Sequence, residues 1–155
     1  MKTAIPANFP GAAWLTLSLL LAGCHAGRPG NLGARDGRLA DCPASPNCVS
    51  SQSPDEAHRI APLPFSGSPA AAMARLAAIV GSLPRATVIT STETYLHAEF
   101  RSAVFRFVDD AEFLLDEGRS VVQIRSASRL GSYDFGANRR RTEAIRARWG
   151  ELAPR

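Results

Sequence analysis

The stretch of the chain that decides its fold begins with VVQIR at residues 121–125, continues with SRLGSYDFGANRRR at residues 128–141 and ends at Trp149. The first run is apolar and β-branched, which is typical of a buried strand. The second is polar and interrupted by glycines, which indicates a turn, and Asp134 is placed to act as the N-cap of a following helix. We expect this helix to pack one stripe, at three- and four-residue spacing, on a sheet. The stripe consists of Phe135, Asn138, Thr142, Ile145, Trp149 and Leu152.

From residue 86 onward, apolar side chains alternate with a period of two, which predicts a series of strands. The expected strands cover residues 87–90, 95–101, 104–108, 112–116 and 120–126. Their links are too short for parallel crossovers of a dozen or more residues, so the sheet must be antiparallel. Before the sheet, Ser68 and Pro69 begin a helix that Gly81 and Pro84 end. We therefore expect an α+β two-layer sandwich, in which an antiparallel meander sheet of about five strands carries two helices on one face.

The N-terminus has the pattern of a bacterial export signal. Lys2 precedes an apolar run at residues 12–21, which is too short to span a bilayer comfortably. Leu21-Ala22-Gly23-Cys24 resembles the lipobox of bacterial lipoproteins, where cleavage precedes a cysteine that receives acyl chains such as palmitate. We therefore expect residues 1–23 to be a lipoprotein signal peptide and Cys24 to anchor the protein to a membrane of the cell envelope, facing the periplasm. His25, in place of an aspartate, favours the outer membrane over the inner one.

Residues 24–41 lack an apolar period and are rich in glycine, which predicts a flexible tether. Cys42 and Cys48 open a single globular domain that we expect to cover residues 42–152. Two cysteines so spaced in an exported chain predict a disulfide, because the compartment is oxidising, and a ring of this size stabilises the fold by about 2–2.5 kcal/mol on the loop-entropy model. A redox dithiol or a metal site with His58 would need a Cys-x-x-Cys spacing or more ligands than the sequence offers.

The composition is that of an ordinary globular domain, with 45% hydrophobic and 21% charged residues in a chain of 155. Charge is segregated along the chain, because residues 93–117 are mainly acidic and residues 119–155 are rich in arginine. We expect these two segments to pair with each other inside the domain. A basic face toward anionic lipid is the alternative, and nucleic acid is not an expected partner in the envelope.

The run CPASPNCVSS at residues 42–51 resembles an uncharacterised group of bacterial and plastid proteins, the domain-of-unknown-function family 1499. The resemblance continues through FRFVDD at residues 105–110 and IRSASRLG at residues 124–131, and it closes with DFGANRRR at residues 134–141. It covers about residues 40–149 of the chain. The family has no established activity, cofactor or catalytic residue, so the resemblance implies an identity and no reaction.

The sequence offers little support for catalysis. Ser50, Asp55 and His58 are the residue types of a hydrolase triad, but they lie in one loop region, and the chain has no Gly-x-Ser-x-Gly elbow. His97 and Glu99 share a strand face, where an exposed polar pair is a better explanation than a metal site with two ligands. We therefore expect no catalytic residues, no cofactor and no metal site.

The turn before the last helix is the best candidate site. Asp134 can cap the helix and pair with Arg129 or Arg141, whereas Asn138 lies on the inward stripe and must find hydrogen-bond partners. One explanation is a polar clamp that fixes the helix to the sheet. The other is a site for a small anion near the helix N-terminus. Its ligands would be Arg129, Asp134, Asn138, Arg139 and Arg141.

Two classes of function therefore stay open. The first is a non-catalytic envelope lipoprotein that acts as a structural or interaction module with an envelope protein partner. The second is a binding domain for a small lipid-like or anionic ligand. A ligand-sized pocket beside Arg129 and Asn138 would favour the binding domain, whereas a packed sheet with Asp134 fully paired would favour the module.

Overall fold

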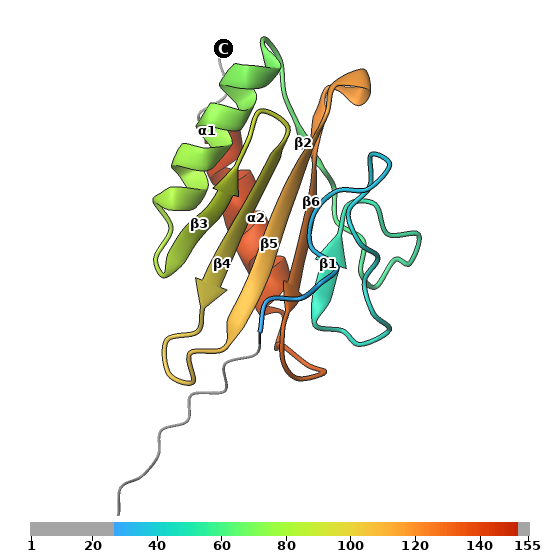
Figure 1. Cartoon of the computed structure of the whole chain (residues 1–155), viewed down its shortest axis with the longest axis vertical. Coiled ribbons are helices and arrows are strands. Elements are labelled where there is room, and N and C mark those ends of the chain that lie inside the picture. Colours follow the sequence, from blue (N-terminus) through green and yellow to red (C-terminus); the bar gives the residue numbers. More distant parts are fainter. Residues whose placement is uncertain (1–26, 152–155) are drawn as a thin grey trace, which may run out of the picture.

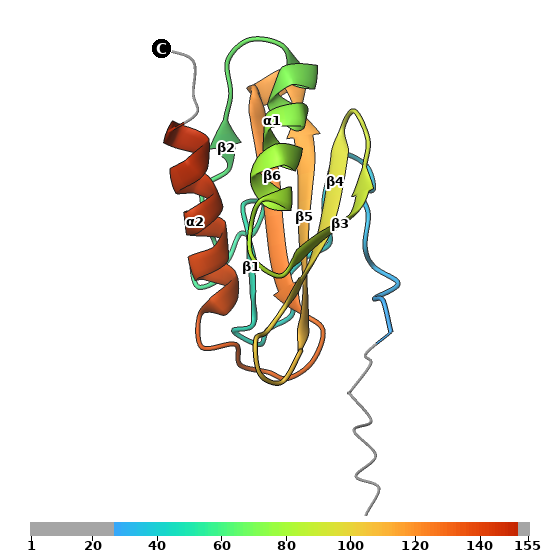
Figure 2. The same ribbon diagram turned by 90° about the vertical axis from the view of Figure 1, so that its left-hand side faces the viewer.

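The computed structural model describes residues 27–151, which form one antiparallel sheet with two helices on the same face (Figure 1 and Figure 2). The elements in chain order are β1 (Cys48–Ser50), β2 (Leu63–Pro64), α1 (Pro69–Gly81), β3 (Ala86–Ser91), β4 (Tyr95–Arg101), β5 (Val108–Asp116), the short 3-10 helix η1 (Glu117–Arg119), β6 (Val121–Ser128) and α2 (Ala137–Glu151). The strand order is β1-β6-β5-β4-β3, and β2 pairs with β6. The predicted α+β sandwich is confirmed. Between residues 27 and 151, no helix has the length and apolar character needed to cross a bilayer.

The core lies between the sheet and the two helices, as the period-two alternation predicts. Leu96 on β4 is opposite Phe113 on β5, which is in turn opposite Ile124 on β6. All three side chains are fully buried. They belong to a single hydrophobic cluster with Leu76, Ile79 and Val80 of α1 and with Ile145 and Trp149 of α2. Burial of each such side chain contributes about 1.5–3 kcal/mol, so this cluster is the main source of the fold's stability.

The strands expected at residues 104–108 and 112–116 are wrong as two elements. The structure has one long strand, β5, over Val108–Asp116, and residues 102–107 form a loop. The sequence suggested a turn at residues 109–111, since adjacent aspartates are rarely buried inside a sheet. Both aspartates are nevertheless buried, because arginines pair with them from opposite faces: Arg141 with Asp109, and Arg129 with Asp110. These partners come from distant segments, and the local pattern therefore does not reveal the strand.

The first helix follows its prediction. The side chain of Ser68 accepts a hydrogen bond of 3.1 Å from the amide of Ala71, and Pro69 occupies the first helical position. The second helix begins at Ala137, two residues later than an N-cap at Asp134 requires. Asp134 still satisfies backbone donors of the first turn, because its carboxylate accepts from the amides of Gly136 and Asn138, each at 2.8 Å.

The inward stripe of the second helix is confirmed in its helical part and wrong at its beginning. Asn138, Thr142, Ile145 and Trp149 are buried. Phe135 is 77% exposed, because its φ of +54° turns the chain away from the sheet before the helix starts. The last predicted member, at position 152, lies outside the described residues.

The loop that carries the cysteines is tied to the sheet. The predicted disulfide between Cys42 and Cys48 is present, with a Cα–Cα distance of 5.6 Å. Cys48 also begins β1, which pairs with β6 in the register Cys48 to Ala127. Neither this strand nor β2 is among the strands that the sequence predicts. Each is too short to show a period, and only pairing with β6 makes it a strand.

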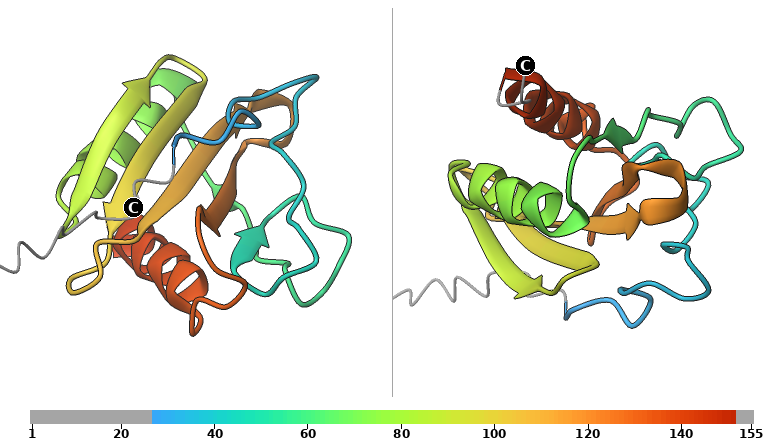
Figure 3. Two further views of the ribbon diagram at one scale, coloured as in Figure 1. Left: turned by 60° about the horizontal axis from the view of Figure 1, so that its bottom comes forward. Right: turned by 90° about the horizontal axis from the view of Figure 1, so that it is seen from above.

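Residues 27–41, for which the composition predicts a flexible tether, make specific contacts with the rest of the domain. They lie across the face of the sheet opposite the helices (Figure 3, right). The amide of Gly33 donates a hydrogen bond of 2.8 Å to Glu112, and Leu39 is buried with its amide bonded to Gln52. The segment covers polar side chains of the sheet, which its own glycine-rich sequence does not indicate. Contacts with the domain therefore extend to residues before 42.

Candidate functional site

The helix face of the sheet contains the polar clamp, which we define as Asn47, Asp109, Ser126, Ser128, Asp134, Asn138 and Arg141. Asn138 is at its centre and is fully buried. Its amide nitrogen faces three acceptors, the carbonyl of Asn47 at 3.0 Å, the hydroxyl of Ser128 at 3.0 Å and the carboxylate of Asp134 at 2.8 Å. Its amide oxygen accepts from Ser126 and Arg141, both at 2.6 Å. One side chain thus joins α2 to β6 and to the disulfide loop.

Two further contacts complete the clamp. Arg141 donates to Asp109 at 2.5 Å, and its guanidinium lies 4.5 Å above the ring centre of Phe100. The amide nitrogen of Asn47 donates to the carbonyl of Gly131 at 2.6 Å. The SPNC motif of the disulfide loop and the RLG motif of the turn are therefore in direct contact, although they are far apart in sequence.

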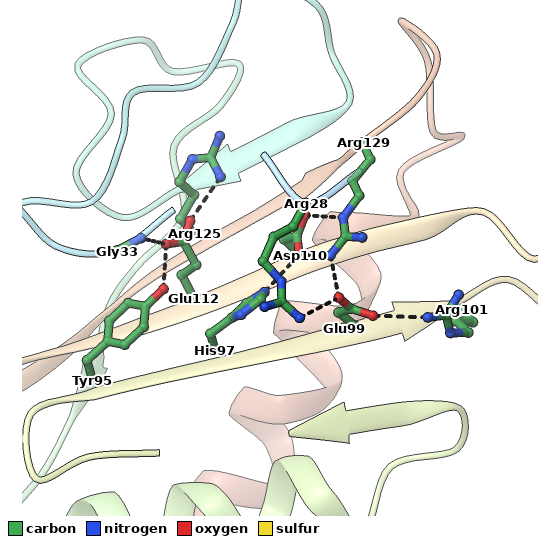
Figure 4. Close-up of polar contacts among 10 residues, drawn as sticks. All are labelled: Arg28, Gly33, Tyr95, His97, Glu99, Arg101, Asp110, Glu112, Arg125 and Arg129. Atoms are coloured by element: carbon green, nitrogen blue, oxygen red, sulfur yellow. Dashed lines mark hydrogen bonds and ion pairs between the residues drawn. The ribbon is translucent and has the colours of Figure 1, made fainter. Parts of the chain in front are cut away.

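The opposite face carries a second network, the ion-pair cluster, formed by Tyr95, His97, Glu99, Asp110, Glu112, Arg125 and Arg129 (Figure 4). Arg129 donates through Nε and Nη2 to the two oxygens of Asp110, at 2.8 and 2.7 Å, and through Nη2 to Glu99 at 2.6 Å. His97 forms a 2.8 Å hydrogen bond with Asp110. Each of these four side chains is less than 10% exposed.

Glu112 forms the other half of the ion-pair cluster. Arg125 donates to it at 3.1 Å, the Tyr95 hydroxyl at 2.7 Å and the Gly33 amide at 2.8 Å. Its side chain is fully buried. The buried carboxyl group therefore has three hydrogen-bond donors around it, one of them a guanidinium, and these contacts offset the cost of its burial.

The electrostatic effect of these contacts is consistent across the cluster. Burial alone would raise the pKa of Asp110 and of Glu99, but the hydrogen bonds and charge of Arg129 outweigh it and lower both pKa values. The hydrogen bond from Arg129 to Asp110 has the largest effect on the pKa of Arg129 and raises it, and the hydrogen bond to Glu99 raises it further. Burial, with the neighbouring Glu112 carboxylate, raises the pKa of the Tyr95 phenol. Asp110, Glu99 and Arg129 are thus held in their ionised forms beside a phenol that is held neutral.

His97 and Glu99 do share a strand face, but they are not the exposed pair that the sequence suggested. They are only 3% and 6% exposed. Glu99 is bound by Arg28 of the N-terminal segment and by Arg129 of the turn after β6. The sequence carried a signal for this, in the acidic run of residues 93–117 and the arginines after residue 119. Their intramolecular pairing is confirmed. What sequence reasoning missed was that Tyr95, Asp110, Glu112 and Arg125 join one network.

The five residues proposed as anion ligands do not converge on one site. Asp134, Asn138 and Arg141 belong to the polar clamp on the helix face, whereas Arg129 reaches the ion-pair cluster on the opposite face. Arg139 is exposed and donates to the carbonyls of Ala57 and Arg59, at 2.7 and 3.0 Å. The expected partnership of Asp134 with an arginine is replaced by pairs of Arg129 with Asp110 and of Arg141 with Asp109.

The residues of the supposed triad likewise do not assemble as a triad. His58 Nδ1 lies 2.8 Å from the Asp55 carboxylate, as a triad would require. Its Nε2, however, lies 3.2 Å from the backbone carbonyl of Ser45, and the Ser50 hydroxyl accepts instead from the amide of Gln52. This histidine therefore links the loop after β1 to the disulfide loop. Within residues 27–151, no group of three His, Cys, Asp or Glu side chains could hold a metal ion.

Two grooves border the networks. One of about 340 Å³ lies on the covered face, lined in part by Asn31, Asp110 and Arg125. The Nε of Arg125 is buried there without a hydrogen-bond partner among the described residues. The other, of about 280 Å³, lies beside the polar clamp and is lined in part by Phe100 and Arg141.

One end of the molecule carries a group of exposed apolar side chains, which we call the apolar end. Its members are Val104 (79% exposed), Phe105 (75%), Phe107 (45%), Leu130 (39%), Tyr133 (61%) and Phe135 (77%). They lie on the β4–β5 loop and the β6–α2 loop, which lie at the same end of the sheet (Figure 1, bottom). The sequence placed three of these residues inside an expected strand and one on the helix stripe, so it did not predict this surface.

Comparison with known proteins places these features in a family. No curated protein and no solved structure matches the chain. A model of the family described as "Protein of unknown function (DUF1499)" matches residues 38–148. This region runs from the end of the N-terminal segment through the disulfide loop and the whole sheet to the last turn of α2. Because the match covers well over half of the sequence, the chain belongs to the DUF1499 family of proteins of unknown function.

Proposed function

We propose that this protein is a lipoprotein of the bacterial cell envelope, anchored through Cys24, whose folded domain is a non-catalytic interaction module. The anchor rests on the Leu21-Ala22-Gly23-Cys24 motif after an apolar run of signal-peptide length. These residues lie outside the described part of the chain. Acyl chains contribute about 0.8 kcal/mol per buried methylene, so an acylated Cys24 would hold the domain at the membrane.

The observation that carries the non-catalytic role is the use of the buried polar groups. Asp134 accepts three hydrogen bonds, from the Gly136 amide and from the backbone and side-chain nitrogens of Asn138. Asp110 and Glu99 are bound by Arg129, and His97 is bound to Asp110. Groups engaged in this way hold the fold together, and a general base or nucleophile would need an unoccupied position facing a substrate. The arrangement supports an interaction module.

The second candidate function is the binding of a small anionic or lipid-like ligand. It is favoured by the groove beside Arg125, whose buried Nε has no partner among the described residues. Native mass spectrometry of the protein purified from membranes in mild detergent separates the candidates. An interaction module should give the mass of the processed, acylated chain alone. A stoichiometric adduct that is lost in an Arg125→Met variant would establish the ligand-binding function instead.

Anchoring is tested by metabolic labelling with a palmitate analogue in a bacterial host. The parent chain should be labelled and should sediment with membranes, whereas Cys24→Ser should be unlabelled and unprocessed at the lipoprotein site. The double variant Cys42→Ser/Cys48→Ser is the matched control, since it removes the other two cysteines and should keep the label. Membrane-bound but unlabelled parent protein would show that the lipid anchor does not exist.

A further inference from the structure

We propose that the apolar end is a membrane-docking surface, which seats the domain end-on in the headgroup region of the bilayer that holds its lipid anchor. The occupant is a phospholipid surface containing anionic lipid. This inference rests on the proposed lipid anchor, and it adds a second contact with the membrane and a fixed orientation for the domain.

The surface has the composition of a membrane-contact site. Four of its six side chains are aromatic, and they form one pair in each loop. Phe105 stacks on Phe107 with ring centres 5.6 Å apart, and Tyr133 meets Phe135 edge-on at 4.9 Å. Tyr133 combines an apolar ring with a polar hydroxyl, a combination that is favoured in the interfacial region of a bilayer. Phenylalanine rings are favoured at the boundary between headgroups and acyl chains. Exposed apolar side chains grouped in this way mark contact sites on a protein surface.

The sheet brings the two loops to one end of the molecule. The β4–β5 loop leaves β4 at Arg101 and enters β5 at Val108, which are partners in the ladder. The β6–α2 loop leaves β6 at Ser128, which pairs with Asp109. Both loops therefore begin at the same end of the strands, and they project together from the domain (Figure 1 and Figure 2).

The position of the anchor selects this end. Arg28 is bound to Glu99 at 3.4 Å, and Glu99 lies two residues before the end of β4 where the first loop begins. Cys24 is four residues before Arg28 in the sequence, so in any conformation the backbone between them reaches at most about 14 Å. An acylated Cys24 must therefore enter the bilayer close to the apolar end. The segment from Cys24 to Arg28 is too short to keep the apolar end far from the membrane.

Charge at this end also suits an anionic surface. The β4–β5 loop has one charged residue, the exposed Arg106. On the β6–α2 loop, the charges of Arg129 and Asp134 are engaged inside the domain. Arg140, at the start of α2, is exposed beside Phe135 and donates to its carbonyl. The exposed charge on the loops and at the start of α2 is therefore positive, and each basic residue near an anionic leaflet adds to the attraction.

Insertion is tested on acylated protein reconstituted in vesicles of phosphatidylethanolamine and phosphatidylglycerol, some containing brominated acyl chains that quench tryptophan. Phe105→Trp places the probe at the apolar end. Ser66→Trp is the matched control on an exposed loop at the other end of the sheet. It is next to Phe65, whose amide donates a hydrogen bond to the carbonyl of Ser120. Trp149, buried in both, gives the common background. Brominated lipid should quench Phe105→Trp at least about twofold more than Ser66→Trp. Equal quenching in protein that is acylated and vesicle-bound would overturn docking while leaving the anchor intact.

A second measurement removes the anchor. A chain produced without residues 1–23 and carrying Cys24→Ser should bind the same vesicles weakly. Adding Phe105→Ser and Phe135→Ser should weaken binding by on the order of tenfold, because two exposed rings no longer leave water. The matched control, Arg148→Ser at the far end of α2, should leave binding unchanged. If the serine changes leave vesicle binding unaltered but abolish a dimer seen by sedimentation, the apolar end is an interface between copies and the proposal fails.

Discussion

Asn138 shows how much a single residue contributes to this fold. Its side chain contacts the carbonyl of Asn47, hydroxyls on β6 and a guanidinium on its own helix. Its inward orientation could be predicted from helical spacing, and its need for partners follows from burial. The identity of those partners could not be predicted, because Asn47 is about ninety residues away in the chain.

Asp134→Ala should lower the free energy of unfolding by about 1–2 kcal/mol, because the first turn of α2 loses the acceptor for two backbone amides. Arg140→Ala, on the exposed side of the same turn, should change it by less than about 0.5 kcal/mol. Urea unfolding of the two variants measures both effects. Equal stability of Asp134→Ala and the parent would contradict the clamp and reopen this turn as a binding site.

At the scale of elements, the hydrophobic period predicted the helices well and the ends of strands poorly. β4 was predicted over its whole length, because its alternation has no interruption. β5 was divided in two, because Asp109 and Asp110 look like a turn until their arginine partners are known. The loop before it was taken for a strand, because Val104, Phe105 and Phe107 resemble a strand in sequence but are exposed.

The N-terminal segment leads to a direct test of where the domain begins. A chain starting at residue 40 should be less stable than one starting at residue 27 by at least about 2 kcal/mol. The shorter chain lacks the buried side chain of Leu39 and the amide of Gly33 that donates to Glu112. Urea unfolding of the two chains measures this difference. As a control, a chain that starts at residue 27 and carries Arg35→Ala should keep nearly the full stability, since that side chain is exposed. Identical unfolding of the short and long chains would restore the interpretation of this segment as a tether.

At the scale of the whole molecule, charge segregation along the chain becomes internal pairing. The acidic strands β4 and β5 meet arginines from β6, the following turn and α2, and each sheet face receives its own set of pairs. This arrangement makes stability depend on pH. The pKa values of Asp110 and Glu99 are lower in the folded protein than their usual values of 3.8 and 4.5. The unfolded chain therefore binds more protons as the solution becomes acidic.

The free energy of unfolding should accordingly stay constant above about pH 5 and fall below about pH 4, as these carboxylates become protonated. Arg129→Gln leaves Asp110 and Glu99 buried without their main partner, which should destabilise the protein by about 3–5 kcal/mol at neutral pH. Without Arg129 the pKa of these carboxyls rises, so the difference from the parent should shrink on acidification. Urea midpoints between pH 7 and pH 3 measure it, with Arg140→Gln as the control. A difference that does not change with pH would show that Arg129 acts through packing alone.

The sequence by itself determined the α+β class, the antiparallel sheet, the first helix, the inward stripe of the second and the disulfide. These follow from residue spacing, short links and local chemistry, all of which act between near neighbours in the chain. Only the tertiary structure decided that residues 27–41 cover the sheet, that β5 is one strand and that Arg129 and Asn138 lie on opposite faces. It also decided that six apolar side chains gather at one end. Each of these depends on contacts between segments far apart in sequence, whose energies no local pattern contains.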